Sequence, residues 1–256
     1  MKWPASITIM RHAQSAYNIL RGKKARSVYY ARFKEAYRRD YQAEETKVLA
    51  QGVQKRWSLG VSDCDTPLTA VGERQSFRTG KKLPQIMSLP DVVLFSPYLR
   101  TKRTLEEVAR GWPELKNVQW IPDERIREQE HGLSLLYSDW RVFNVLHPEQ
   151  KRMHDLLGPY WYQFPQGESA AQVRDRCREE VAMLIREYDG QKVLLVTHHL
   201  TILSFRANLE RPTPEEFIRL DEEEKPVNCG VTQYIGNPNA GRDGRLELKF
   251  YNKSLC

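Results

Sequence analysis

The chain has 256 residues, of which 40% are hydrophobic and 29% are charged, a balance typical of a folded protein rather than a disordered or fibrous one. No stretch approaches the roughly 20 apolar residues that a membrane span requires, and residues 1–10 lack the pattern of a secretory signal. The net charge is +7, and the whole excess lies in residues 21–56, which hold eleven Lys and Arg against four Asp and Glu. Such a localised charge favours an anionic partner, either a phosphorylated small molecule or nucleic acid.

The four cysteines, at positions 64, 177, 229 and 256, form no C-x-x-C pair. Neither a zinc knuckle nor a dense disulfide framework is therefore expected, and the chain is predicted to work in a reducing, cytoplasmic compartment. The length suits one mixed α/β domain with a sizeable core, so we expect a single domain over residues 1–256.

The first predicted strand covers residues 6–10, where polar and β-branched residues alternate, and it ends at Arg11 and His12. A helical insertion is predicted next, at about residues 21–57. Residues 25–51 contain neither Gly nor Pro, and aromatic side chains recur every four positions, at Tyr29, Phe33, Tyr37 and Tyr41. One side of such a helix would be aromatic and the rest basic. This aromatic stripe either packs on the main domain beneath a solvated charged face or belongs to a lid or binding element.

Helices and strands alternate through the rest of the chain. Helices are predicted over residues 69–83, 99–109 and 169–188, and from Thr213 onward. Strands are predicted over residues 91–95, 193–196, 230–235 and 245–251. Ser169 and Gln172 stand in capping-box register at the start of their helix. The alternation predicts a layered α/β fold.

Several common catalytic motifs are absent from the sequence. It has no G-x-G-x-x-G, no G-x-x-x-x-G-K-[ST] and no H-E-x-x-H, so dinucleotide, P-loop and zincin sites have no local support. Residues 167–171 approach a nucleophile elbow but lack its final Gly, so Ser169 is predicted to be a helix cap. His198 and His199 are adjacent, and neighbours in an extended segment point to opposite faces and do not easily share one ion. We expect neither a metal nor a cofactor.

Polar residues follow the ends of three predicted strands. Arg11 and His12 end the first strand, Arg100 begins the helix after the second, and His198 ends the third. Sites in open α/β sheets form at the carboxyl ends of strands, so we expect these four side chains to meet in one crevice. Two guanidinium groups can clamp a phosphate, and histidine can act as nucleophile, acid or charge stabiliser. The pattern therefore predicts a site that handles phosphate.

The spacing also resembles that of a known family. Residues 11–18, Arg-His-Ala-Gln-Ser-Ala-Tyr-Asn, are similar to the R-H-G-[EQ]-[ST]-x-x-N signature of the histidine phosphatase superfamily, also called phosphoglycerate mutase-like. Five further stretches agree in order: residues 66–75 with P-L-T-x-x-G-x-x-Q, 96–104 with S-P-x-x-R-x-x-x-T, 127–132 with R-E-x-x-x-G, 167–169 with G-E-S, and 196–198 with [ST]-H-G. The matches run from position 11 to about 198 and leave the insertion uncovered.

The resemblance implies a fold and a role for each matched residue. The fold would be a three-layer sandwich with a mostly parallel central sheet flanked by helices and a helical insertion after the first strand. His12 would be the phosphoryl-accepting nucleophile and Glu128 the proton donor. The transferred phosphate would be bound by Arg11, Arg100 and His198, with help from Asn18.

Three positions depart from the family pattern. Ala13 and His199 replace the usual glycines, and Gln14 replaces the commoner Glu. If the position of Ala13 required a positive φ, the change would be costly. None of the three removes a reacting group, so we expect activity to survive.

The implied function is that of a metal-independent phosphomonoester hydrolase, which acts on a phosphorylated small molecule through a phosphohistidine. One alternative is a mutase of the same family, although the extended sequence that sugar-phosphate mutases carry after the position of Glu128 is missing. Another is a non-catalytic binding or scaffold protein, against which the retention of all the reacting residues argues. We expect neither a membrane nor nucleic acid as partner. The basic insertion is expected to form a helical cover that attracts substrates with additional negative charge.

Overall fold

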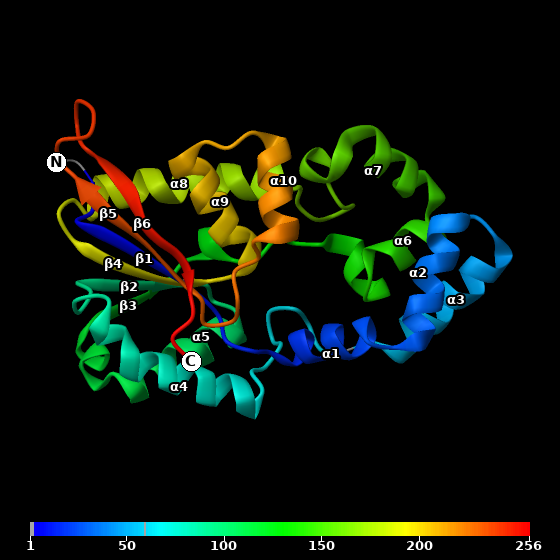
Figure 1. Cartoon of the computed structure of the whole chain (residues 1–256), viewed down its shortest axis with the longest axis horizontal. Helices are drawn as coiled ribbons and strands as arrows, with labels where there is room; N and C mark the ends of the chain where they lie inside the picture. The colour runs from blue at the N-terminus through cyan, green and yellow to red at the C-terminus, as the bar shows by residue number, and fades with distance from the viewer. Residues whose placement is uncertain (1–2, 59) are drawn as a thin grey trace. The chain divides into compact units, whose positions relative to one another are not determined.

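The computed structural model describes residues 3–58 and 60–256, which form two compact units (Figure 1). The first, here called the sheet unit, comprises the chain up to Ser15, Asp63–Glu128 and Val173–Cys256. The second, here called the helical unit, comprises Ala16–Ser62 and Gln129–Gln172. The chain therefore passes from one unit to the other four times.

The sheet unit is built on one sheet, which in the described part of the chain has six strands in the order β3-β2-β4-β1-β5-β6. The strands are β1 (Ser6–Arg11), β2 (Val92–Phe95), β3 (Gln119–Pro122), β4 (Lys192–Thr197), β5 (Val231–Asn237) and β6 (Arg245–Lys253). Strands β3, β2, β4 and β1 run parallel, whereas β5 is antiparallel to β1 and to β6. The predicted α/β fold with a mostly parallel sheet is confirmed.

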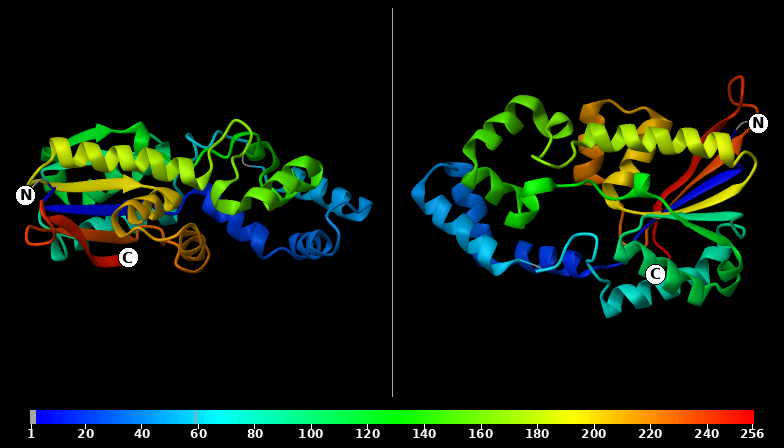
Figure 2. Two further views of the ribbon diagram at one scale, coloured as in Figure 1. Left: turned by 90° about the horizontal axis from the view of Figure 1, so that it is seen from above. Right: turned by 180° about the vertical axis from the view of Figure 1, so that it is seen from behind.

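Helices cover both faces of this sheet. They are α4 (Ala70–Lys82), α5 (Leu99–Gly111), most of α8 (Ala170–Glu187), α9 (His199–Glu210), α10 (Pro214–Glu223), and the 3₁₀ helices η1 (Leu83–Gln85), η2 (Pro113–Asn117) and η3 (Glu124–Ile126). Figures 1 and 2 show α4 and α5 on one face and α8 and α9 on the other, so the three layers are confirmed. Across residues 3–58 and 60–256, no helix has the length and apolar character needed to cross a membrane.

The central strands are apolar because both of their faces are covered. All four residues of β2 are buried, as are Val193–Val196 of β4. On the side of α4 and α5, these strands contribute to one core cluster, whose members include Met10, Leu83, Phe95, Leu105, Trp112, Leu115 and Leu194. The continuous apolar runs in the sequence are thus the inner strands of a sheet covered by helices on both sides.

The register of the parallel strands brings their carboxyl ends to one edge of the sheet. Arg11 of β1 pairs with Thr197 of β4, and Phe95 of β2 pairs with Val196. The next residue of β1, His12, donates its backbone N–H to the Thr197 carbonyl over 2.8 Å. The ends of β1, β2 and β4 therefore place the residues that follow them next to one another.

The helical unit contains the predicted insertion and a second segment. Its helices are α1 (Ala16–Ala25), α2 (Val28–Arg39), α3 (Glu44–Arg56), α6 (Trp140–Leu146) and α7 (Pro148–Trp161), with the 3₁₀ helix η4 (Gly132–Tyr137). The helical character of the insertion is confirmed, and the insertion consists of more than one helix, because the chain breaks between α2 and α3. Asp40 ends α2: its carboxylate accepts the Gln42 N–H at 2.8 Å and its carbonyl accepts the Thr46 hydroxyl at 2.7 Å. These bonds compete with the helical ones.

The aromatic stripe packs inside the helical unit itself. Phe33 is fully buried, and Tyr29, Tyr37 and Tyr41 are partly buried around the same cluster. Its other buried members include Tyr30, Leu49, Val53, Val142 and Val145, from α2, α3 and α6. The stripe is thus part of the core of a small helical unit.

Candidate active site

His12 follows β1 and is held as a neutral ring. Its side chain is 3% exposed, and Nδ1 lies 2.7 Å from the Ala13 carbonyl oxygen. Because a carbonyl oxygen only accepts hydrogen bonds, Nδ1 carries the proton, and the lone pair of the neutral ring lies on Nε2. Burial, followed by the charges of Arg100 and Arg11, holds the pKa of His12 well below its ordinary value. His12 therefore offers a neutral nucleophilic nitrogen.

His198 follows β4 and packs edge-on against His12, with 5.2 Å between the ring centroids. It is fully buried, and its Nε2 lies 2.8 Å from the hydroxyl oxygen of Ser96. Burial and then Arg100 hold the pKa of His198 well below its ordinary value. The ends of three parallel strands thus supply His12, Ser96 and His198 to one place.

Arg100 lies in the first turn of α5 and is 4% exposed. The Tyr98 ring contacts both Arg100 and His198: the guanidinium carbon is 4.8 Å from the Tyr98 centroid, and the Tyr98 and His198 centroids are 5.1 Å apart. Both terminal nitrogens of Arg100 bind Asp63, at 3.0 and 3.3 Å from its carboxylate oxygens. The buried cation beside the histidines is therefore paired with a carboxylate.

The last residues of β1 are also tied to the segment before β5. Arg11 donates from Nη1 to the Pro226 carbonyl over 2.6 Å, and Asn228 donates from Nδ2 to the His12 carbonyl over 3.0 Å. The charge of Arg11 is felt at both histidines. The segment before β5 thus fixes the backbone on which the candidate nucleophile stands.

Glu128 is the last residue of the sheet unit before the chain enters the helical unit. Its carboxylate accepts the backbone N–H groups of His199 and Leu200, each at 3.2 Å, at the N-terminus of α9. Because α9 begins directly after His198, this carboxylate is anchored one residue along the chain from the buried histidine.

The residues around the P-L-T segment hold the backbone that follows His12. Thr69, the N-cap of α4, donates its hydroxyl to the Gln14 side-chain oxygen at 2.8 Å, and Gln75 accepts the Gln14 N–H at 3.3 Å. Gly72 lies against the same residue, because a Cβ there would stand 2.2 Å from the Gln14 carbonyl oxygen. Thr69, Gly72 and Gln75, which correspond to the T, G and Q of P-L-T-x-x-G-x-x-Q, therefore all pack against Gln14.

The structure accommodates Ala13 and His199, the two residues that stand where the family pattern has glycine. Ala13 has no positive φ, is fully buried, and donates its N–H to the Thr104 hydroxyl at 3.0 Å. His199 is the first residue of α9, and its Nε2 lies 2.8 Å from Asp221. His198 and His199 thus contact different residues, and neither replacement strains the backbone.

Ser169 and Gln172 exchange the reciprocal bonds of a capping box, at 3.2 and 2.8 Å, which confirms the predicted helix cap.

Of the six predicted site residues, five lie in the sheet unit, whereas Asn18 lies in the first turn of α1 in the helical unit. The sequence analysis missed Asp63 and Asn228, since neither stands in a recognisable motif. Three aromatic residues follow one another in the helical unit, and of these Tyr160 and Tyr162 are buried whereas Trp161 is exposed.

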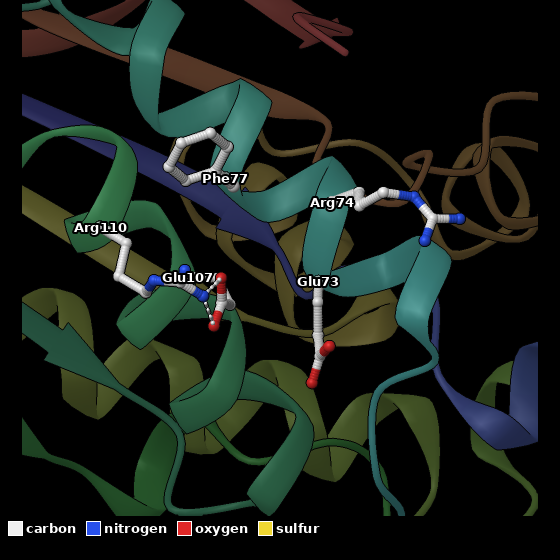
Figure 3. Close-up of a pocket in the computed structure, with 5 residues that line it drawn as sticks. All are labelled: Glu73, Arg74, Phe77, Glu107 and Arg110. Atoms are coloured by element: carbon white, nitrogen blue, oxygen red, sulfur yellow. Dashed lines mark hydrogen bonds and ion pairs between the residues drawn. The ribbon is translucent and has the colours of Figure 1, made fainter.

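A metal centre and a surface pocket are two other kinds of site. Within residues 3–58 and 60–256, no three His, Cys, Asp or Glu side chains gather as ligands for a metal ion. Figure 3 shows a pocket formed by α4 and α5, lined by Glu73, Arg74, Phe77, Glu107 and Arg110, where the last two form an ion pair of 2.8 Å. None of the predicted site residues lines it.

The chain matches known proteins in sequence. The sequence model described as the histidine phosphatase superfamily (branch 1) matches residues 53–239, a range that includes Arg100, Glu128 and His198 and begins after His12. Phosphoglycerate mutase-like protein AT74H of Arabidopsis thaliana is 30% identical over 179 residues, 62% of this chain and 61% of that protein. The chain thus matches less than two thirds of that relative's length. Probable phosphoglycerate mutase GpmB of Serratia proteamaculans (strain 568) is 32% identical over 158 residues, 57% of this chain and 68% of that protein.

Solved structures match almost the whole chain. A mycobacterial glucosyl-3-phosphoglycerate phosphatase in complex with inorganic phosphate aligns with a TM-score of 0.63 and 18% identity, covering 98% of each chain. A putative alpha-ribazole-5'-P phosphatase from Escherichia coli str. K-12 substr. MG1655 aligns with a TM-score of 0.67 and 17% identity, covering 98% of this chain and 97% of the other. At these identities, the likeness shows a shared fold.

Proposed function

The chain belongs to the histidine phosphatase superfamily (branch 1), and on that premise we propose that it hydrolyses phosphomonoesters of small molecules through a phosphohistidine at His12. The observation that carries the proposal is the state of His12: a buried, neutral ring whose Nδ1 is engaged by a carbonyl, beside His198 and Arg100. This arrangement supplies a nucleophilic nitrogen without the need for a base to deprotonate it.

The reaction would proceed in two steps. In the first, Nε2 of His12 forms a bond to phosphorus while the bond to the ester oxygen breaks, and Glu128 gives its proton to the leaving alkoxide. In the second, Glu128 takes a proton from water as the water oxygen attacks phosphorus, and the N–P bond breaks. Arg11, Arg100 and His198, with Asn18, would bind the phosphoryl oxygens, because phosphoryl transfer depends mainly on positioning and charge stabilisation.

The test is covalent labelling combined with turnover. A panel of phosphomonoesters is screened with EDTA present for release of inorganic phosphate, and the best substrate is then used with labelled phosphorus in a brief reaction. We expect an acid-labile, base-stable label on His12, and loss of both label and turnover in His12→Ala. A matched control is His154→Ala, in the helical unit, which should keep both. Label that survives in His12→Ala would contradict the proposal.

The names of the sequence relatives favour a second candidate, a phosphoglycerate mutase-like phosphotransferase. Such an enzyme returns the phosphoryl group from histidine to a hydroxyl of its product instead of to water. Hydrolysis is preferred because the chain lacks the extended sequence after Glu128 that sugar-phosphate mutases carry. The same experiment separates the two, since a mutase would isomerise a phosphorylated acid with little release of inorganic phosphate.

We also propose a cytoplasmic location for the enzyme. The proposal is supported by the four cysteines, none of which forms a disulfide in the part of the chain that the structure describes, and two of which are exposed.

A further inference from the structure

The segment that carries Glu128 is held by its backbone carbonyls. Arg176, in α8, donates from Nη1 to the Arg125 carbonyl at 2.7 Å and from Nη2 to the Glu128 carbonyl at 3.0 Å. Between these two bonds, Thr197 donates its hydroxyl to the Ile126 carbonyl at 2.6 Å and Thr201 donates to the Arg127 carbonyl at 2.7 Å. Four consecutive carbonyls therefore each accept a side-chain hydrogen bond, and one arginine takes the first and the last.

These bonds complement those that hold the carboxylate. The carboxylate of Glu128 is bound by the first two N–H groups of α9, and Thr197 and Thr201 lie at the end of β4 and in the first turn of α9. Arg176 alone of the three donors comes from another element, α8. It therefore ties the carboxyl-bearing backbone to α8, whereas the two threonines tie it to β4 and α9, between which His198 stands.

We propose that Arg176 is a positioning residue for the proton transfer by Glu128. This inference rests on the proposed function, in which the Glu128 carboxyl must stand within hydrogen-bond reach of the leaving oxygen. A displacement of about 1 Å can cost on the order of 100-fold in rate. The forked guanidinium spans two carbonyls that are three residues apart, whereas a lysine ammonium has one donor head and no fork.

The charge of Arg176 acts separately from its fork. After burial, Arg100, His12 and Arg11, Arg176 also contributes to the lowered pKa of His198, so its charge is felt at the phosphate site. Removal of the whole side chain would therefore change both the position of Glu128 and the field at the phosphate. Arg176→Lys keeps the charge and removes only the fork, which makes it the variant of choice.

The experiment compares two substrates that need the acid to different degrees. Nitrophenolate leaves without much protonation, whereas an alkoxide needs a proton. The quantity compared is kcat/KM, which covers the steps through phosphorylation of His12 and not the later hydrolysis of the phosphohistidine that both substrates share. We expect Arg176→Lys to lower kcat/KM about tenfold or more for an alkyl phosphate, by no more than about twofold for p-nitrophenyl phosphate, and to leave inhibition by inorganic phosphate unchanged. Arg176→Ala should show the same preference and bind phosphate more weakly. Arg178→Lys, exposed on the same helix and 3.5 Å from Asp175, is the matched control and should behave as the parent protein.

Glu128→Gln is measured in parallel, and thermal melts establish that each variant is folded. If Glu128→Gln slows the alkyl phosphate selectively and Arg176→Lys does not, the positioning role is overturned while the proposed function stands. Equal losses on both substrates in Arg176→Lys also overturn it, because a merely structural defect acts on both. If Glu128→Gln itself lowers kcat/KM equally for both substrates, the assignment of Glu128 as the acid fails, and the role of Arg176 fails with it.

Discussion

Arg100 places both terminal nitrogens on Asp63, and its Nη1 also reaches the Asp63 carbonyl at 2.5 Å. The Arg100 side chain is 5% exposed and that of Asp63 is 24% exposed, so solvent screens this ion pair only in part. In the proposed function, a phosphate on Arg100 would be a second anion at the same guanidinium fork. Asp63 would then compete with phosphate for Arg100, and its charge would limit how tightly phosphate binds.

The first prediction follows from this competition. Asp63→Asn should lower the inhibition constant of inorganic phosphate roughly five- to tenfold, equivalent to about 1 kcal/mol. Asp65→Asn removes the same charge from an exposed residue two positions away and should change the constant much less. Weaker binding of phosphate by Asp63→Asn would show instead that Asp63 is needed to orient Arg100.

The second prediction concerns the contact between Gly72 and residue 14. In Gly72→Ala the new methyl group would meet the Gln14 carbonyl oxygen at 2.2 Å, so the backbone two residues beyond His12 must move. We expect the free energy of unfolding to fall by about 1–3 kcal/mol and kcat to fall as well. Gly22→Ala, in α1, meets no atom within 4 Å and should be neutral or slightly stabilising. Equal melting temperatures for the two variants would contradict the prediction.

The third prediction concerns a buried cation within the basic segment. Lys24 donates to Asp139 at 2.8 Å and to the Ser138 carbonyl at 2.7 Å, and Tyr30 also donates to Asp139. Lys24→Met leaves the Asp139 carboxylate buried without its main partner, so we expect a loss of on the order of 3 kcal/mol in the stability of the helical unit. Lys23→Met, exposed and adjacent, should change stability by less than about 0.5 kcal/mol. Denaturant unfolding measures both.

The fourth prediction is a pH dependence of stability. Glu180 is fully buried, and the single guanidinium of Arg125 contacts both Glu180 and Asp123, each at 3.0 Å. Burial, followed by Asp123, raises the pKa of Glu180 from 4.5 to about 8. Because the pKa is higher in the folded state, the stabilisation from this group is full below about pH 4.5 and is lost as the pH rises through 8.

This dependence is measured as melting temperature against pH. The parent protein should lose several degrees between about pH 5 and pH 8.5, whereas Glu180→Gln should give a flatter curve over the same range. Glu179→Gln, at the exposed neighbouring position, should keep the slope of the parent protein. A parent slope that persists in Glu180→Gln would exclude Glu180 as its source.

The sequence predicted the elements whose signal is local. The strand that became β1 alternates polar and β-branched residues, those that became β2 and β4 are short apolar runs, and polar residues follow all three at once. The general rule that parallel strands end at one edge brought His12, Arg100 and His198 together. The capping box at Ser169 was likewise readable, because a cap depends on residues three positions apart.

Other elements carried no such signal. Helix α9 is buried on nearly all sides over residues 200–207, so its sequence lacks the amphipathic period by which a surface helix is found. Strand β3 has no fully buried residue and therefore lacks an apolar face. The pairing of Arg100 with Asp63 depends on how the loop that contains Asp63 packs against α5. The spacing of residues along the sequence does not reveal this packing. One expectation stays a prediction, namely that the cations of residues 21–56 attract highly charged substrates.

The division of the chain into two units also separates its tryptophans evenly. Trp3, Trp112 and Trp120 belong to the sheet unit, and Trp57, Trp140 and Trp161 to the helical unit. Each unit thus contains its own intrinsic fluorophores. A variant with phenylalanine in place of the helical unit's three tryptophans would report the unfolding of the sheet unit, and the converse variant would report that of the helical unit. Coincident transitions would show that the chain melts cooperatively as a single thermodynamic unit, and an earlier transition of the helical unit's tryptophans would show that this unit opens while the sheet unit remains folded.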